Sequence, residues 1–149
     1  MPSHPFRIAR SSTGLGVFAT ERIPRNRRIV EYTGVKLPNK EVEEMPGRPR
    51  YLYDLNSRYT LDGSPRSNLG RYANHSCRPN AEIIEYRGRV WVKSKRAIEP
   101  GEEITYDYGR AYFKEFIGEN CKCVRCEARR AKEAPRYAAE RIKPSIRRK

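Results

Sequence analysis

Long apolar runs are missing from this chain of 149 residues. Nowhere do about 18 apolar residues follow one another, the least that a membrane-spanning helix needs. The first twelve residues, MPSHPFRIARSS, also lack the apolar stretch of roughly 7–15 residues that a secretory signal contains. We therefore expect a soluble protein that is made in the cytosol and has no membrane partner.

Cysteine and histidine are scarce, at four and two residues. Thiols in the cytosol are kept reduced, so these cysteines favour a metal site or catalysis over disulfides. One histidine and one cysteine lie together in RYANHSCRPN, residues 71–80. Taken alone, His75 is better explained as a hydrogen-bonded histidine of a turn than as a ligand.

Acidic residues are too few to balance the basic ones, which leaves a net charge of +14 and a pI near 10.0. Such a charge favours a polyanionic neighbour, either nucleic acid or a substrate bound to it. Residues 127–149 carry nine Lys or Arg and three Glu, which is typical of a solvated tail that can bind phosphates. One hypothesis is therefore a basic module that binds nucleic acid without catalysis.

The length fits one domain plus tails, and most of the chain has strand-like patterning. The clearest hairpin has Arg87-Gly88 as its turn, and Asp62-Gly63 is the predicted turn of another. Only 39–45 and the segment after Cys126 have helical composition. We predict a mostly β fold of small sheets, whose strand-like segments are 8–23, 28–37, 51–63, 81–98 and 99–108. The strand in 28–37 is expected to end at Gly34.

Four short blocks occur in one order along the chain: GLGVFA at 14–19, RYANHSCRPN at 71–80, GEEITYDYG at 101–109 and CKCVRC at 121–126. In this order they resemble the signature of SET-domain protein lysine methyltransferases, of the small bacterial or viral type, followed by a post-SET zinc motif. The resemblance implies a SET domain at 5–110, a zinc segment at 111–127 and a basic tail at 128–149. It also implies a knot-like crossing where the Asn-His-Ser-Cys stretch meets the strand that ends at Tyr108.

The implied reaction moves a methyl group from S-adenosylmethionine to a lysine amine, so amine, methyl and sulfonium must lie in line. The amine must be neutral, although the pKa of free lysine is about 10.4, and a poorly hydrated channel favours the neutral form. Tyrosine suits the walls because it offers a ring and a hydroxyl. By resemblance, Tyr108, Tyr106 and Tyr32 are catalytic and Tyr51 and Tyr53 line the substrate channel, although the last two read equally well as ordinary strand aromatics.

The resemblance assigns cofactor binding to two of the blocks. Glycine allows close backbone approach, although a G-x-G alone also fits a hairpin turn. Asn68 is expected to support the site. A tyrosine at 106, where the family has Phe or Tyr, implies mono- or dimethylation of a lysine. The implied cofactor residues are Gly14, Leu15, Gly16, Arg71, Asn74 and His75.

Three cysteines lie close together at 121, 123 and 126, and tetrahedral Zn²⁺ takes four ligands. The resemblance makes Cys77 the fourth ligand. The family commonly has four residues between the last two cysteines, and this chain has two. A disulfide or redox role of Cys123 and Cys126 remains an alternative.

The resemblance also implies a partner and a location. The substrate is expected to be a histone or a nucleoid protein, with nucleic acid as a further possible partner through the basic surface. The corresponding locations are the cytoplasm or nucleoid of a bacterium, or the host nucleus for a viral or effector protein.

Overall fold

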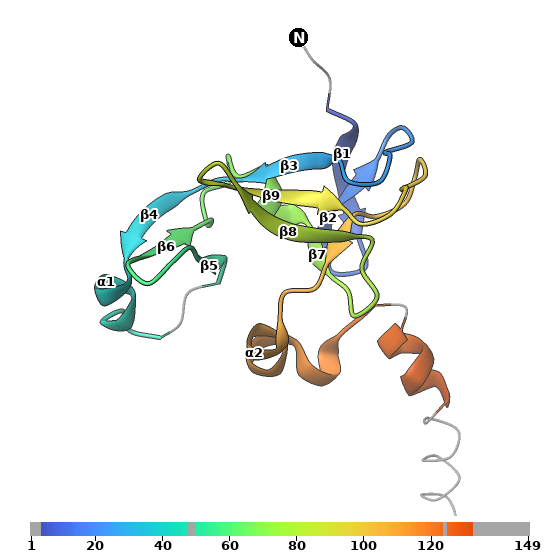
Figure 1. Cartoon of the computed structure of the whole chain (residues 1–149). Helices are drawn as coiled ribbons and strands as arrows, with labels where there is room; N and C mark the ends of the chain where they lie inside the picture. The colour runs from blue at the N-terminus through green and yellow to red at the C-terminus, as the bar shows by residue number, and fades with distance from the viewer. Residues whose placement is uncertain (1–3, 48–49, 124, 133–149) are drawn as a thin grey trace, which may run out of the picture.

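The computed structural model describes residues 4–47, 50–123 and 125–132. This part of the chain is mostly β, as predicted, and its ten strands form four small sheets (Figure 1). Strands β1 and β2 form one sheet, β3-β9-β8 and β4-β6-β5 two more, and β7 and β10 the last. The strands are β1 (Phe6–Ser11), β2 (Gly14–Ala19), β3 (Arg28–Tyr32), β4 (Val35–Pro38), β5 (Leu52–Asp54), β6 (Tyr59–Asp62), β7 (Asn74–His75), β8 (Ala81–Tyr86), β9 (Arg89–Ser94) and β10 (Thr105–Tyr106).

The hairpin of β8 and β9 confirms the clearest sequence signal. Tyr86 pairs with Arg89, and both turn residues have positive φ, 50° at Arg87 and 77° at Gly88. Two such residues form the tight turn whose twist matches that of antiparallel strands. Strand β9 alternates exposed or half-buried residues with buried Val90, Val92 and Ser94, so one face of the hairpin lies on the core.

One predicted turn is misplaced. The turn of the β5–β6 hairpin lies at 55–58, where Asn56 Oδ1 accepts the amide protons of Arg58 and Tyr59. Asp62-Gly63 instead ends β6, the central strand of its sheet. Residues 55–58 and 62–63 both have the polar composition of a turn, and pairing across the sheet decides which of them forms the hairpin turn. The break expected at Gly34 is present, since β3 ends at Tyr32, β4 begins at Val35 and the two strands belong to different sheets.

The helices are short. Helix α1 (Asn39–Glu43) and helical residues 125–132 agree with the sequence. The sequence did not indicate η1 (Leu69–Tyr72), α2 (Arg110–Tyr112), the π-helical turn η2 (Phe113–Ile117) or η3 (Gly118–Asn120), because single turns lack a detectable period. None of the described helices is long and apolar enough to cross a bilayer. Pro135, Pro144 and most of the predicted basic tail lie outside the described residues.

The main core lies between the β1–β2 hairpin and the β3-β9-β8 sheet. Its fully buried members are aliphatic, and burying each such side chain contributes about 1.5–3 kcal/mol. Some come from strands and others from the loops after β2 and β9. An isolated β-bridge between Ile23 and Ile98 joins these two loops. The largest are Val17, Ile23, Val92, Ile98 and Ile104.

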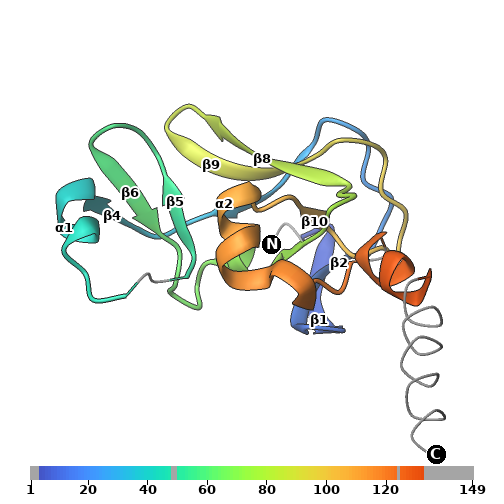
Figure 2. The same cartoon turned by 90° about the horizontal axis from the view of Figure 1, so that it is seen from below.

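Strands β7 and β10 bring two of the sequence blocks together. They pair in parallel, Asn74 with Thr105 and His75 with Tyr106. Just beyond the pair, Asn80 donates to the Glu103 carbonyl at 2.8 Å and accepts the Thr105 amide proton at 2.9 Å. The expected meeting of the Asn-His-Ser-Cys stretch with the Tyr108 strand is thus present. Helix α2 and the turns after it cover this region when the molecule is seen from below (Figure 2).

Candidate active site and metal centre

Two cavities meet beside the β7–β10 pair. The larger, of about 400 Å³, lies between the β1–β2 turn, β7 and the segment that follows α2. The smaller, of about 80 Å³, is walled mainly by tyrosines. Both cavities are lined by Tyr51, Arg71, Tyr108 and Tyr112. These shared side chains therefore separate a group bound in one cavity from a group bound in the other.

Tyr108 lies at the junction, two residues after β10. Its hydroxyl donates a hydrogen bond to the Ala73 carbonyl, and its ring packs against Tyr106 and edge-on against Tyr112, with centroids 4.8 and 5.0 Å apart. Burial raises the pKa of Tyr108 well above its usual value, so it remains a neutral phenol at physiological pH. Because its proton is already donated, its oxygen is left as an acceptor.

The smaller cavity contains the other tyrosines that the sequence singled out. Tyr32 donates its hydroxyl proton to the Tyr51 carbonyl at 2.7 Å. The Tyr106 hydroxyl has no hydrogen-bond partner among the described residues. Burial raises the pKa of both Tyr32 and Tyr106. The tyrosines of the walls are therefore uncharged, Tyr53 among them, and Arg71 is the one cation among the described residues that line this cavity.

Tyr51 has an unusual backbone conformation. Its φ is 67°, a left-handed value that costs a non-glycine residue about 1–3 kcal/mol. Its carbonyl accepts both the Tyr32 hydroxyl and the Gly63 amide, the latter at 2.8 Å. The Arg71 guanidinium lies 4.4 Å from the Tyr51 ring centroid and donates to the Ser64 carbonyl. These contacts hold Tyr51 between the cavities and keep a fixed positive charge beside both.

Asn74 connects the glycine block to the larger cavity. Its Nδ2 donates to Ser11 Oγ at 3.1 Å, to the Leu15 carbonyl at 3.0 Å and to Glu103 Oε1 at 2.7 Å. Its Oδ1 has no partner among the described residues. A Cβ at Gly16 would lie 2.5 Å from Glu103 Oε1 and 3.1 Å from Asn74 Nδ2, so a side chain there would displace the Glu103 carboxylate from its contact with Asn74.

The predicted cofactor residues fall into two groups in the structure. Leu15, Arg71, Asn74 and His75 line the larger cavity, whereas Gly14 and Gly16 do not. Asn68, fully buried, accepts the Thr33 amide proton and donates to the Gly63 carbonyl. It therefore supports the Tyr32–Tyr51 region without lining a cavity.

His75 links the cavity to the cysteines. Its side chain is only 4% exposed. Its Nδ1 accepts the Tyr108 amide proton at 3.1 Å, and its Nε2 lies 3.3 Å from Cys77 Sγ. Desolvation lowers the pKa of His75 against the opposing effect of Asp107, so the ring is neutral. With Nδ1 an acceptor, the proton is on Nε2 and points to the sulfur.

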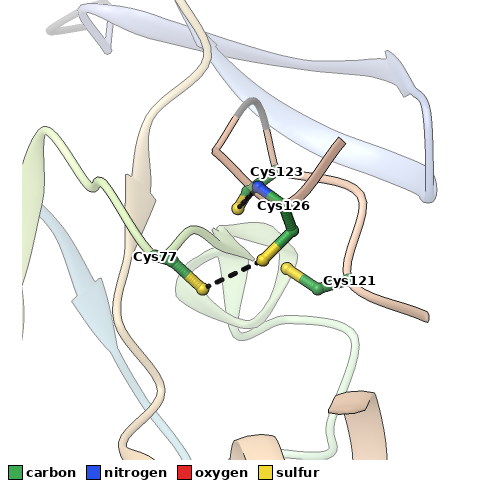
Figure 3. Close-up of side chains that lie close together, drawn as sticks. All are labelled: Cys77, Cys121, Cys123 and Cys126. Carbon is green, nitrogen blue, oxygen red and sulfur yellow. Dashed lines mark hydrogen bonds between the residues drawn. The ribbon is translucent and has the colours of Figure 1, made fainter. Parts of the chain in front are cut away.

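The four cysteines converge as the zinc hypothesis predicts (Figure 3). Their sulfurs all lie within 4.8 Å of one another, and those of Cys77 and Cys126 are 3.6 Å apart. All four thiols are free. In a tetrahedral site with Zn–S bonds of about 2.3 Å, neighbouring sulfurs are about 3.8 Å apart. The donor set and its spacing therefore fit a structural Zn²⁺ and do not favour the disulfide alternative.

Several residues of the larger cavity were not identified from the sequence. Tyr112 is the most important of them because it lines both cavities. Its position as an aromatic residue between the Tyr108 strand and the cysteines was the available signal. The other missed residues are Thr13, Arg50, Tyr72, Ile117, Asn120 and Lys122.

Comparisons with known proteins agree with this geometry. A family model described as "SET domain" matches residues 14–109. The chain is 34% identical over 144 residues to "Probable histone-lysine N-methyltransferase set-23" of Caenorhabditis elegans, a match that covers 86% of this chain and 58% of that protein.

Two further relatives are much longer proteins. "Histone-lysine N-methyltransferase, H3 lysine-4 specific" of Aspergillus oryzae is 37% identical over 117 residues, 70% of this chain and 9% of its own length. "Histone-lysine N-methyltransferase ash1" of Drosophila melanogaster is 32% identical over 127 residues, 78% of this chain and 6% of its own length. This chain thus spans less than two thirds of each of these three relatives.

Proposed function

The chain belongs to the SET-domain family, and we propose that it is an S-adenosylmethionine-dependent protein-lysine methyltransferase. The observation that carries the proposal is the junction of the two cavities at Tyr108. A volume of about 400 Å³ lies in the range of small-molecule sites, roughly 300–1,000 Å³. The narrow tyrosine-walled cavity beside it has the shape and polarity that an unbranched amine side chain requires.

The larger cavity is assigned to the cofactor, which supplies a methyl group on a positively charged sulfonium when bound. Asn74 Oδ1 is free to accept a hydrogen bond from an ammonium group, since Nδ2 is fully engaged. Arg71 lines the same cavity and offers a cation for a carboxylate. These two side chains suit the amino-acid end of the cofactor.

The smaller cavity is assigned to the substrate lysine. The cavity is too narrow for more than a little water, and none of its tyrosines is ionised at neutral pH. Its walls therefore do not stabilise an ammonium by charge. The Arg71 guanidinium beside it further disfavours the charged amine. The Tyr108 oxygen accepts a hydrogen bond from the amine and orients its lone pair toward the methyl group. No general base is needed to perform the transfer itself.

Mono- or dimethylation is the proposed outcome. The Tyr106 hydroxyl lies in the smaller cavity and has no protein partner among the described residues, so it can hold a water molecule. That water occupies space which a second or third methyl group would need.

Zinc is the proposed metal, held by Cys77, Cys121, Cys123 and Cys126. Its contribution is structural, since it joins the segment after α2 to the stretch that contains Asn74 and His75. That segment supplies Ile117, Asn120, Cys121 and Lys122 to the wall of the larger cavity.

A histone or nucleoid protein is the proposed substrate. The three relatives are named histone-lysine methyltransferases, and the net charge of +14 suits a substrate that is presented on nucleic acid. The cytoplasm or nucleoid of a bacterium, or a host nucleus, is the corresponding proposed location.

Transfer of the labelled methyl group from S-adenosylmethionine to core histones and nucleoid proteins, mapped by mass spectrometry, tests the proposal. We expect Tyr108→Phe to reduce turnover at least a hundredfold, because the hydroxyl that orients the amine is lost. Tyr59→Phe is the matched control, since Tyr59 is exposed and lines neither cavity. If the wild type modifies no basic protein while binding zinc and DNA, the chain is a non-catalytic basic module instead.

A further inference from the structure

A second functional feature lies away from the two cavities, where two basic loops run side by side. One is the loop between β2 and β3, and the other follows β9 (Figures 1 and 2). Both loops are at the opposite end of the molecule from α1 and β4 (Figure 1). We call seven basic residues of these loops and of the adjoining ends of β3 and β9 the basic ridge: Arg22, Arg25, Arg27, Arg28, Lys93, Lys95 and Arg96.

Ser94 fixes the two loops against each other. It is fully buried, its Oγ accepts the Arg27 amide proton at 2.9 Å, and it donates to the Pro24 carbonyl at 2.6 Å. Its backbone accepts from Asn26 at 3.0 Å and donates to Arg27 at 2.9 Å. The two segments that carry the ridge are therefore held together through Ser94, whose partners here are all main-chain atoms.

Only two of the seven cations have ion-pair partners within the described chain. Arg22 lies 3.3 Å from Glu99, and Arg96 lies 2.9 Å from Glu102. Glu82 faces Lys93 across the strand pair without a close contact. Arg25, Arg27 and Lys95 are exposed and make no ion pair with a described residue. Like charges held close together repel one another and destabilise the folded state. An anionic ligand reduces this repulsion.

Arg28 extends the ridge onto the outer face of the β8–β9 hairpin. Its guanidinium lies 4.0 Å from the ring centroid of Tyr86 and 5.4 Å from that of Trp91. Arg87 lies 5.3 Å from the same Tyr86 ring. Stacking on an aromatic face orients a guanidinium while its N–H groups remain free at the rim.

We propose that the basic ridge binds the phosphate backbone of duplex DNA. Protein–DNA interfaces are polar and strongly positive, whereas the centre of a protein–protein interface is apolar and poor in charge. In the two loops, the exposed residues from 21 to 28 and at 95 and 96 are charged or polar apart from Pro24. This composition favours phosphates over an acidic protein.

The ridge leaves both cavities accessible when DNA is bound. Neither cavity is lined by any of its seven residues. DNA can therefore bind while the cofactor and a lysine side chain are in place. The purpose of such binding rests on the proposed function, since it would keep the enzyme beside a lysine of a DNA-bound protein. The binding itself does not depend on methyl transfer.

The test compares two triple variants of the full chain, each with three charges removed. The ridge variant is Arg25→Gln/Arg27→Gln/Lys95→Gln, which keeps every contact of Ser94 because those contacts are to main-chain atoms. The control is Lys36→Gln/Lys40→Gln/Arg58→Gln, three exposed residues of β4, α1 and the β5–β6 turn. Binding to a fluorescent 25-base-pair duplex is measured over a range of KCl concentrations, without cofactor or histone.

We expect the ridge variant to lose about three units of the slope of log K against log salt, about one unit for each phosphate contact. If the affinities of the two proteins converge near 1 M salt, this corresponds at 0.1 M salt to a loss in affinity of roughly 500- to 1,000-fold. The control should change by no more than about threefold, because charges more than a Debye length away are screened.

Equal losses in the two variants would overturn the proposal, since net charge alone would then account for binding. Unchanged DNA binding by the ridge variant would also overturn it. Poly-glutamate serves as an acidic polypeptide in the same assay, and a ridge variant that lost poly-glutamate binding while its DNA binding persisted would overturn the proposal as well. An absence of methyl transfer in all three proteins would overturn the proposed function and leave the ridge assignment to be decided by the DNA data.

Discussion

At the residue scale, a single hydroxyl group at Tyr106 is expected to determine how many methyl groups are added. Tyr106→Phe should shift the product from mono- and dimethyl-lysine toward trimethyl-lysine, because the space held by a bound water becomes free. The hydroxyl has no protein partner among the described residues, so we expect the free energy of unfolding to change by less than about 1 kcal/mol. Mass spectrometry of early products measures the shift. Trimethyl-lysine as the main early product of the wild type would contradict it.

The same tyrosines predict the pH dependence of the reaction. The rate should rise with pH as the substrate amine loses its proton, whose free pKa is about 10.4. An ionised tyrosine would oppose this rise by stabilising the ammonium, but burial raises the pKa of Tyr32, Tyr106 and Tyr108 above 10. Because kcat/KM follows the protonation of the free amine, kcat/KM measured between pH 7 and 10 should increase throughout. A decline in rate within that interval, with the fold intact, would show that a channel tyrosine ionises early.

Residue types in the site could be predicted, but their contacts could not. Tyr106 and Tyr108 stand in a recognisable block, and so do Asn74 and His75. The left-handed backbone of Tyr51, the Arg71 guanidinium over its ring and the Nε2 contact of His75 with Cys77 depend on pairings between distant segments. Gly16 shows the same limit, because a side chain there would displace the carboxylate of Glu103, a residue far from it in the sequence.

At the scale of elements, the segment from α2 to residue 132 should depend on zinc. Without metal, desolvation raises the pKa of Cys77 and, to about 11, that of Cys121. Those thiols are then protonated at neutral pH, so metal binding releases protons and should weaken as pH falls. Chelation or Cys126→Ser should speed hydrogen exchange after residue 110 and spare the β core. Added zinc should restore protection in the chelated wild type but not in the variant. Protein that contains no zinc when purified without chelator would contradict the prediction.

Elements with strong local signals were predictable, and those stabilised by distant pairing were not. The β8–β9 hairpin has both alternation and a turn of Arg87-Gly88, so its position follows from local chemistry. Strands β7 and β10 have two residues each, too few for any periodicity, and exist because each pairs with the other in parallel. The turns of η2 and η3 likewise owe their place to the cysteines that follow them.

At the scale of the whole molecule, charge should act before any contact is made. The net charge of +14 repels a free basic peptide at long range, and salt screens that repulsion, with a Debye length of about 8 Å at 0.15 M. We therefore expect kcat/KM for a free histone peptide to rise between about 0.02 and 0.15 M salt. For the same lysine in a protein bound to DNA, kcat/KM should fall over this interval, because salt weakens contacts with phosphates.

The two opposite slopes separate charge effects on the encounter from effects on the chemistry. A peptide with the same lysine and neutral flanking residues is the control, and its kcat/KM should stay nearly constant because it has little charge to be screened. If salt lowered kcat/KM equally for all three substrates, the salt would be acting on the enzyme itself, through the cofactor cavity or the cysteine cluster. If the slope for the DNA-bound substrate became flat in the Arg25/Arg27/Lys95 variant while that for the free peptide still rose, the ridge would be the part of the molecule through which DNA holds the substrate near Tyr108.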